Sequence, residues 1–240
     1  MVSSHTGQSK ASRAKAADER KLRQDICRIG KAMSKSGLCA FLGVYAPGNL
    51  SARLPGSNRI IISPSGLDKG SLKPRDLVVV DLDGKQVEGR NRPSVETSMH
   101  CAIYRKRPNV NGIVHAHSPG CLGFAVAHEE IPATTIELAA VVGRRVPIAE
   151  YATPGTEKLG EITANTLGDG GAVVMANHGL VAVGHSLDEA FHVALSVEMT
   201  ALVNLRAKAL GSIVELPAGE VSGIRRYVLQ KYGQKQKGYA

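Results

Sequence analysis

The segment VNGIVHAHSPG, residues 110–120, combines an apolar run with two alternating histidines and an abrupt Ser-Pro-Gly ending. An apolar run that stops at a proline is typical of a buried strand. The pattern therefore predicts a strand over 110–117 and a short helix from Pro119 to about residue 127. Because successive side chains of a strand alternate between its faces, His115 and His117 should point to the same side.

Two neutral imidazoles on one side of a strand can supply two of the three protein ligands of a catalytic zinc site. A His-x-His pair also occurs by chance on surface strands, so the pair alone does not decide between the two interpretations. A third histidine, His178, lies in the short connection Asn177-His178-Gly179 between two apolar runs. It could cap a turn, or it could project toward the same site.

Glu96 follows Pro93-Ser94 at the start of a predicted helix that reaches about residue 106, with Ser94 as the expected N-cap. A carboxylate in the first turn can simply stabilise the helix dipole, by about 0.3–1 kcal/mol. It can also act as an acid/base group if it faces a site. Both interpretations remain open from the residues alone.

Two short loops rich in glycine and hydroxyl groups, PGNLS at 47–51 and SPSG at 63–66, adjoin predicted strands. Loops of this kind can present backbone N–H groups and hydroxyls to a phosphate or a carboxylate. Turn residues in the same region predict two β-hairpins. The strands of these hairpins are expected at 49–54 with 59–63 and at 77–81 with 86–88.

The rest of the chain alternates between helical and strand patterns. Further strands are expected at 146–148, 172–176 and 180–184, and further helices at 16–36, 156–167 and 186–210. Several hairpins combined with several crossover helices indicate an α/β protein, in which a mixed, mainly antiparallel sheet lies between two helical layers (α/β/α). Residues 1–15 are polar and expected to be disordered, which leaves 16–240 as a single domain with a mobile C-terminal tail.

Composition excludes several classes of protein. The 240 residues, 43% of them hydrophobic, suffice for one sizeable core. No apolar run approaches the roughly 18 residues of a membrane span, and the polar N-terminus lacks a secretory apolar region. The four cysteines include no C-x-x-C pair and are expected to be reduced. We therefore expect a cytoplasmic protein without a membrane partner.

The net charge of +9 is concentrated at the two ends of the chain. Residues 1–25 hold six basic and three acidic side chains, and residues 221–240 hold five basic and no acidic ones. The residues between them carry only +1 of the total. A groove that binds nucleic acid needs its charge on the folded surface, with aromatic side chains among the basic ones. Solvated tails are the simpler explanation, and no nucleic-acid partner is expected.

Taken in chain order, these motifs resemble those of the class II aldolase/adducin family, from about residue 22 to the C-terminus. No single motif is specific, but their combination in this order is. The matching segments are Gly48-Asn49-Leu50-Ser51-Ala52-Arg53, Ser63-Pro64-Ser65-Gly66, Pro93-Ser94-Val95-Glu96 with His100 and Tyr104 following, Val114-His115-Ala116-His117, Tyr151-Ala152-Thr153-Pro154-Gly155-Thr156 and Asn177-His178-Gly179-Leu180.

The resemblance implies a metal-dependent carbon–carbon lyase, foremost an aldolase that cleaves a ketose phosphate. His115, His117 and His178 match the family's metal ligands, for Zn²⁺ or another divalent cation such as Mn²⁺ or Co²⁺. Glu96 matches the carboxylate that approaches the metal and acts as acid/base, and Tyr232 matches a mobile C-terminal tyrosine that closes over the site. The phosphate-binding positions of the family match Gly48, Asn49, Ser65, Gly66 and Ser94. The family also implies a small anionic substrate and a homotetramer with active sites at its interfaces.

The chain departs from the family pattern at three positions. Ile136 stands where the aldolase has a substrate-protonating tyrosine, Val95 where it has a second phosphate-binding serine, and Pro154 where it has an aromatic residue. Glu137 is a candidate replacement for the missing proton donor. A metal-dependent decarboxylase of a hydroxy, keto or aromatic carboxylic acid is therefore the alternative function. A non-catalytic adducin-like module comes third, because all three histidines and Glu96 are retained.

Overall fold

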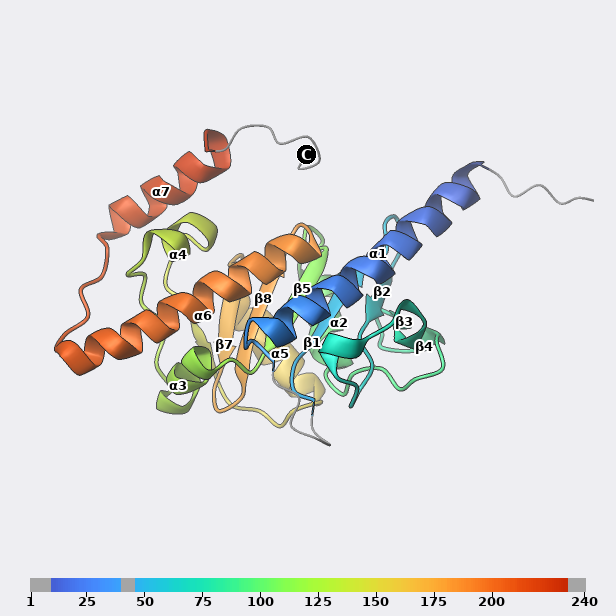
Figure 1. The fold of residues 1–240 in the computed structure, drawn as a ribbon, viewed down its shortest axis with the longest axis horizontal. Helices are drawn as coiled ribbons and strands as arrows, with labels where there is room; N and C mark the ends of the chain where they lie inside the picture. The colour runs from blue at the N-terminus through green and yellow to red at the C-terminus, as the bar shows by residue number, and fades with distance from the viewer. Residues whose placement is uncertain (1–9, 40–45, 233–240) are drawn as a thin grey trace, which may run out of the picture.

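The computed structural model describes residues 10–39 and 46–232, with only the backbone described for residues 10–15. Its centre is an eight-stranded sheet of order β4-β3-β2-β1-β5-β8-β7-β6 (Figure 1). The β6–β7 pair is parallel and the other neighbouring pairs are antiparallel. The strands are β1 (Asn49–Arg53), β2 (Arg59–Ile62), β3 (Val78–Asp81), β4 (Gln86–Glu88), β5 (Gly112–Ala116), β6 (Ile148–Ala149), β7 (Ala172–Met175) and β8 (Gly179–Gly184).

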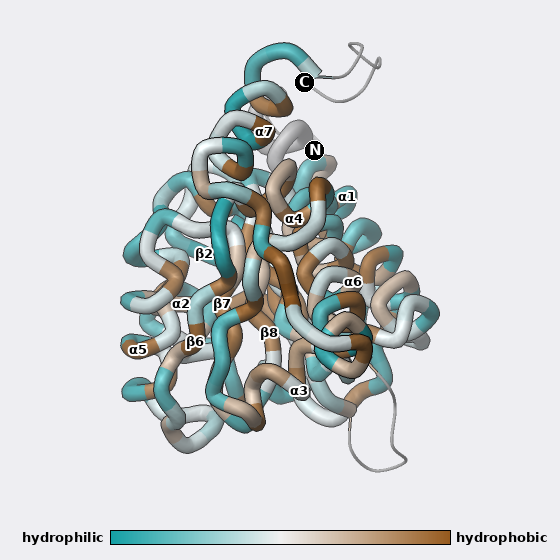
Figure 2. Tube along the Cα trace, turned by 90° about the vertical axis from the view of Figure 1, so that its left-hand side faces the viewer, coloured by the Kyte–Doolittle hydropathy of each residue, from teal (hydrophilic) through white to brown (hydrophobic). Residues whose placement is uncertain are grey.

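Helices cover both faces of this sheet. The helices α1 and α6 cross one face, and α2 and α5 pack against each other on the opposite face (Figures 1 and 2). The last helix, α7, stands away from the sheet and packs on α4. The helices are α1 (Lys10–Lys35), α2 (Thr97–Lys106), α3 (Pro119–Ala127), α4 (Ile136–Val141), α5 (Glu157–Leu167), α6 (Leu187–Leu210) and α7 (Ala218–Gln230), with short 3₁₀ turns η1 (Lys69–Ser71) and η2 (Pro74–Asp76).

Alternate side chains of the central strands enter two separate cores. On β5, Ile113 is buried in the core beneath α2 and α5, whereas Val114 is buried in the core beneath α1 and α6. On β7, Val173 is buried beneath α2 and α5, and Val174 is buried beneath α1 and α6. Each fully buried aliphatic side chain contributes about 1.5–3 kcal/mol, so both layers hold the sheet firmly. The predicted three-layer α/β/α fold with a mixed, mainly antiparallel sheet is confirmed.

Three local predictions need correction. The first helix begins at Lys10 rather than at residue 16. It therefore overlaps the lead that was expected to be disordered; the alanines and basic residues there are good helix formers. Ser94 is not the N-cap of α2, because Glu96 occupies that position and the Ser94 hydroxyl accepts from the Glu96 N–H within a preceding turn. The strand expected at 146–148 forms at Ile148–Ala149 instead.

Two helices were not predicted at all. Helix α4 has six residues and buries only Leu138 and Ala139, so it offers almost no periodic apolar pattern. Helix α7 contains two glycines and buries only Val221. Such helices depend on tertiary contacts more than on their own sequence.

None of the helices in the described ranges is long and apolar enough to cross a membrane. All four cysteines lie in these ranges and are free thiols; Cys39, Cys101 and Cys121 are buried. The cysteines therefore contribute to packing and form no cross-links, as the absence of a paired motif predicted.

Candidate metal centre and active site

The two histidines of the HAH motif share one face of the central strand. His115 lies in β5 and His117 directly follows the strand, and their Nε2 atoms are 2.9 Å apart. His115 is two residues after Ile113, so both side chains lie on the same face of β5. His115 therefore points toward the layer of α2 and α5. The predicted orientation of the pair is present in the structure.

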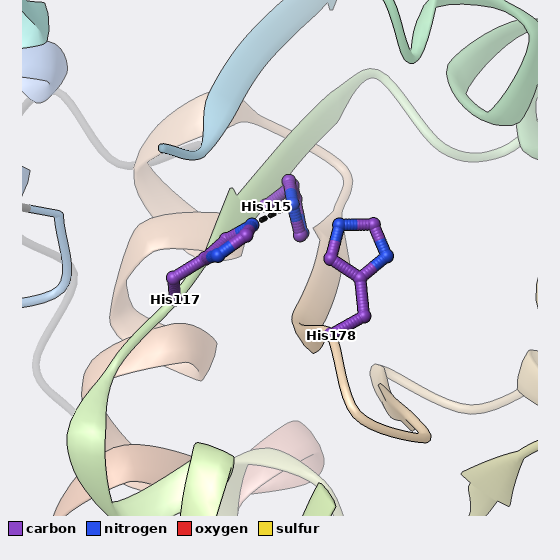
Figure 3. A group of neighbouring side chains, drawn as sticks. All are labelled: His115, His117 and His178. Carbon is purple, nitrogen blue, oxygen red and sulfur yellow. Dashed lines mark hydrogen bonds between the residues drawn. The ribbon is translucent and has the colours of Figure 1, made fainter. Parts of the chain in front are cut away.

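His178 reaches the same point from a different part of the sheet. It lies in the turn between β7 and β8, where Asn177 adopts a left-handed conformation with φ of 55°. The ring centroids of His115, His117 and His178 are 4.8–5.0 Å apart, and each pair of rings is close to perpendicular. Figure 3 shows the three side chains converging from β5 and from the β7–β8 turn.

A backbone contact sets the tautomer of His115. Its Nδ1 lies 2.9 Å from the carbonyl oxygen of Leu180 on β8. Because a carbonyl can only accept, Nδ1 carries a hydrogen, and Nε2 is the ring nitrogen that faces His117 and Glu96. Burial lowers the pKa of the His115 imidazole, but the Glu96 carboxylate outweighs burial and raises it. The Glu96 carboxylate therefore stabilises a positive charge at the centre of the cluster.

Glu96 joins this cluster from the N-cap of α2. Its Oε2 lies 3.0 Å from His115 Nε2 and its Oε1 lies 3.0 Å from His178 Nε2. Burial raises the pKa of the Glu96 carboxyl, but the two neighbouring histidines, His115 foremost, outweigh burial and hold the pKa well below its usual range. The carboxylate is therefore ionised at neutral pH. In contrast, burial and the charges of His115 and His178 lower the pKa of His117 to about 3.

A buried chain of hydrogen bonds holds Glu96 in place. Asn49 Nδ2 donates to Glu96 Oε2 at 2.8 Å, so its Oδ1 is free to accept from His100 Nε2 at 2.5 Å. The unprotonated Nδ1 of His100 then accepts from the Ser51 hydroxyl at 2.6 Å. Burial and the nearby His115 charge lower the pKa of His100 to about 3, which agrees with a neutral ring.

Sequence reasoning assigned no role to His100 or Ser51, although both lay in matching motifs. Two spacings in the sequence could have indicated that Ser51 and His100 lie near Asn49 and Glu96. Asn49 and Ser51 are alternate residues of β1, and Asn49 pairs in register with His115 on β5. His100 lies four residues after Glu96, one turn along α2, and therefore on the same helix face.

The cluster opens into a cavity of about 550 Å³. Both glycine-rich loops contribute to its wall, and so do Val95 and Pro154, which stand at positions where the family pattern differs. The wall also contains Lys69 and Tyr151, which sequence reasoning did not single out. The predicted site residues that line the cavity are Gly48, Asn49, Ser65, Gly66, Ser94, Glu96, His117 and His178.

Tyr232 lies apart from this group. Its side chain is 70% exposed just beyond α7, and its ring contacts that of Tyr227 with centroids 6.2 Å apart. Ile136 and Glu137 begin α4 and are also exposed. The structure of a single chain therefore brings the histidines, Glu96 and the loops together, but not Tyr232.

Gly48 allows the first loop to approach the metal cluster closely. Its φ is +74°, and a Cβ at this position would lie 2.7 Å from the carbonyl oxygen of His115 and would also meet the Cys39 sulfur. We expect Gly48→Ala to lower the free energy of unfolding by about 2–4 kcal/mol, from backbone strain and overpacking together. Urea denaturation measures this loss.

Gly56 provides a matched control for Gly48. Its φ of +62° is similar, but no described atom lies within 4 Å of an added Cβ. Gly56→Ala should therefore cost only the backbone term, about 1–2 kcal/mol. Equal losses in the two variants would contradict the close packing of Gly48 against β5.

The donor set fits a divalent metal ion. Three imidazoles and a carboxylate are ligands that Zn²⁺ and similar cations accept, and tetrahedral zinc places its nitrogen ligands about 3.3 Å apart. Glu96 Oε1 is buried, yet it makes no well-directed hydrogen bond to the described residues despite its nearness to His178. A cation at the centre of the cluster would satisfy this oxygen while no substrate is bound.

A family model described as "Class II Aldolase and Adducin N-terminal domain" matches residues 24–205, most of the chain. The chain belongs to the class II aldolase and adducin family. Enzymes of this aldolase class depend on a metal ion, and His115, His117 and His178 could hold one here.

Two proteins similar to this chain are sugar-phosphate aldolases. The 5-deoxy-D-ribulose 1-phosphate aldolase of Bacillus thuringiensis serovar kurstaki is 37% identical over 215 residues, covering 90% of this chain and 98% of the relative. The L-fuculose phosphate aldolase of Escherichia coli (strain K12) is 34% identical over 185 residues, covering 77% of this chain and 83% of the relative. Together these matches identify an enzyme of the lyase class.

A solved structure of an L-fuculose 1-phosphate aldolase has the same fold. It superimposes with a TM-score of 0.80 at 33% sequence identity and covers 93% of this chain and 98% of that one. The similarity therefore extends over nearly the whole class II aldolase fold, including the sheet and both helical layers.

Proposed function

We propose that this chain is a zinc-dependent aldolase that cleaves a ketose phosphate. The observation that carries the proposal is the convergence of three imidazoles and an ionised carboxylate at a cavity walled by two glycine-rich loops. Relatives named as aldolases of deoxyribulose and fuculose phosphates support the substrate class. Mn²⁺ or Co²⁺ would suit the same ligands.

His115, His117 and His178 would hold the cation through their Nε2 atoms. When bound, such a cation supplies Lewis-acid polarisation of substrate oxygens. The chain's own contribution is orientation, because the Leu180 carbonyl fixes the ring of His115 through Nδ1. Three protein ligands leave a coordination position for substrate, which is typical of catalytic rather than structural sites.

Glu96 is the proposed acid/base group. Its Oε2 accepts a hydrogen bond from Asn49, so Oε1 is the oxygen positioned to take a proton from a substrate hydroxyl and to return it. The hydrogen-bond chain through His100 and Ser51 keeps the carboxylate from rotating away. A positioned carboxylate of this kind typically contributes about 10²–10⁴-fold to the rate.

The two glycine-rich loops are the proposed binding site for the substrate phosphate. Residues of both loops line the same cavity as Glu96, where their hydroxyls and available N–H groups would meet the phosphate. Such groups bind anions without bringing charged side chains into the site. The residues proposed for this role are Gly48, Asn49, Ser65, Gly66 and Ser94.

The proposed assembly is a homotetramer with its active sites at subunit interfaces. Large apolar side chains on α4, α6 and α7 remain exposed in a single chain, which supports burial against other copies. Tyr232 would close over a site within that assembly. The exposed apolar side chains of these helices are Ile136, Met199, Val203, Leu205, Leu210, Tyr227 and Leu229.

Product analysis tests this function. The metal-loaded protein is incubated with ketose phosphates and, separately, with hydroxylated carboxylic acids, and aldehyde and carbon dioxide are both quantified. We expect an aldehyde from a ketose phosphate. Carbon dioxide from an acid without any aldehyde would instead establish the decarboxylase. Purified protein that binds no stoichiometric metal would favour a non-catalytic module.

A further inference from the structure

Lys69 is a buried lysine in the same cavity for which the proposed mechanism has no use. It begins η1 and is only 3% exposed, yet its side chain lines the cavity with Glu96 and His178. The backbone of Lys69 packs closely against α1 at Gly30. There is no space between them, because a Cβ added at Gly30 would lie 2.6 Å from the Lys69 carbonyl oxygen. The side chain therefore extends from a rigid base.

The Lys69 ammonium lies between the two glycine-rich loops. Nζ donates to the carbonyl oxygen of Leu67 at 2.8 Å and to that of Ala46 at 3.2 Å. Leu67 directly follows the Ser65-Gly66 loop, and Ala46 directly precedes the loop that contains Gly48 and Asn49. An ammonium has three N–H groups, so one remains for a group in the cavity.

No carboxylate in the described part of the chain lies within ion-pair distance of this ammonium. Burial lowers the pKa of the Lys69 amine, and the charges of Cys39 and Asp68 offset that effect only in part. An unpaired buried charge is costly, and chains avoid it unless an opposite charge arrives. An anionic ligand in the cavity would supply that opposite charge.

We propose that Lys69 pairs with the phosphate of the substrate and selects doubly charged phosphate esters over uncharged sugars. This inference rests on the proposed function and adds a charged residue to a site built otherwise from N–H groups and hydroxyls. Apart from histidines, the described wall carries one carboxylate, Glu96, and one ammonium, Lys69. With a divalent cation in place, the cavity has two net positive charges, which match the dianion of a phosphate monoester.

Calorimetric binding of sn-glycerol 3-phosphate to the metal-loaded, full-length protein tests this assignment, with glycerol as the uncharged control. Lys69→Gln keeps a hydrogen-bond donor for the loop carbonyls but removes the charge, and we expect it to weaken binding about ten- to a hundredfold. Lys69→Arg retains the charge and should stay within a few-fold of the parent. The dependence of the affinity on salt should also fall in Lys69→Gln.

The melting temperature and the metal content of each variant show whether Lys69 merely ties the two loops together. Equal affinity in the parent and Lys69→Gln would overturn the assignment. So would parallel losses in Lys69→Gln and Lys69→Arg that accompany a lower melting temperature or less bound metal. If the parent itself does not bind the phosphate ester, the Lys69 assignment and the phosphate site both fail. Aldehyde release, measured independently, then decides the lyase assignment.

Discussion

Replacement of His178 by alanine is expected to abolish stoichiometric metal binding and turnover together. The variant removes one of the three imidazoles that would hold the cation, and it leaves His115 and His117 with only the carboxylate that is proposed to move protons, Glu96. Since loss of an outer partner alone typically costs 10–100-fold in metal affinity, loss of a direct ligand should cost about a hundredfold or more. Elemental analysis after gel filtration and an activity assay on the same sample measure both effects.

His178 is the most informative of the three positions because it lies in a turn. His115 is fully buried in the central strand, so its replacement would also disturb the sheet. His192, exposed on α6, is the matched control, and His192→Ala should keep both metal and activity. A His178→Ala protein that retains one metal ion per chain and the parental rate would exclude the proposed centre.

Replacement of Glu96 by glutamine is expected to lower kcat by about 10²–10⁴-fold while the metal is retained. The amide has the same shape and its oxygen can still accept from Asn49, so the hydrogen-bond chain to His100 survives. It cannot take a proton at neutral pH, which removes the acid/base function. Steady-state kinetics with saturating metal, and the metal content of the variant, test this expectation.

Glu157 separates acid/base catalysis from stabilisation of a helix dipole. It lies in the first turn of α5 and is exposed, outside the cavity. Glu157→Gln should reduce stability by at most about 1 kcal/mol and leave the rate unchanged. If Glu96→Gln behaved in the same way, with an unchanged rate, Glu96 would be a dipole partner only.

The sequence by itself determined most of the local structure, because local structure depends on neighbouring residues. The alternation in HAH placed His115 and His117 on one face, and the Ser-Pro step ended β5 and started α3 where predicted. The helices expected at 156–167 and 186–210 also form, with Thr156 and Ser186 as their N-caps. Motif order then indicated the family and the residues of the metal site.

Only the tertiary structure decided which distant residues meet, because that depends on strand order and helix placement rather than on local period. From its own residues His178 could have been a turn cap; pairing of β5 with β8, Ala116 opposite Leu180, brings it to the cluster. Placement of β1 beside β5 and beneath α2 assembled the chain of Ser51, His100, Asn49 and Glu96. The burial of Lys69 between two loops, with no carboxylate in ion-pair contact with its ammonium in the described part of the chain, likewise depends on packing that no spacing in the sequence specifies.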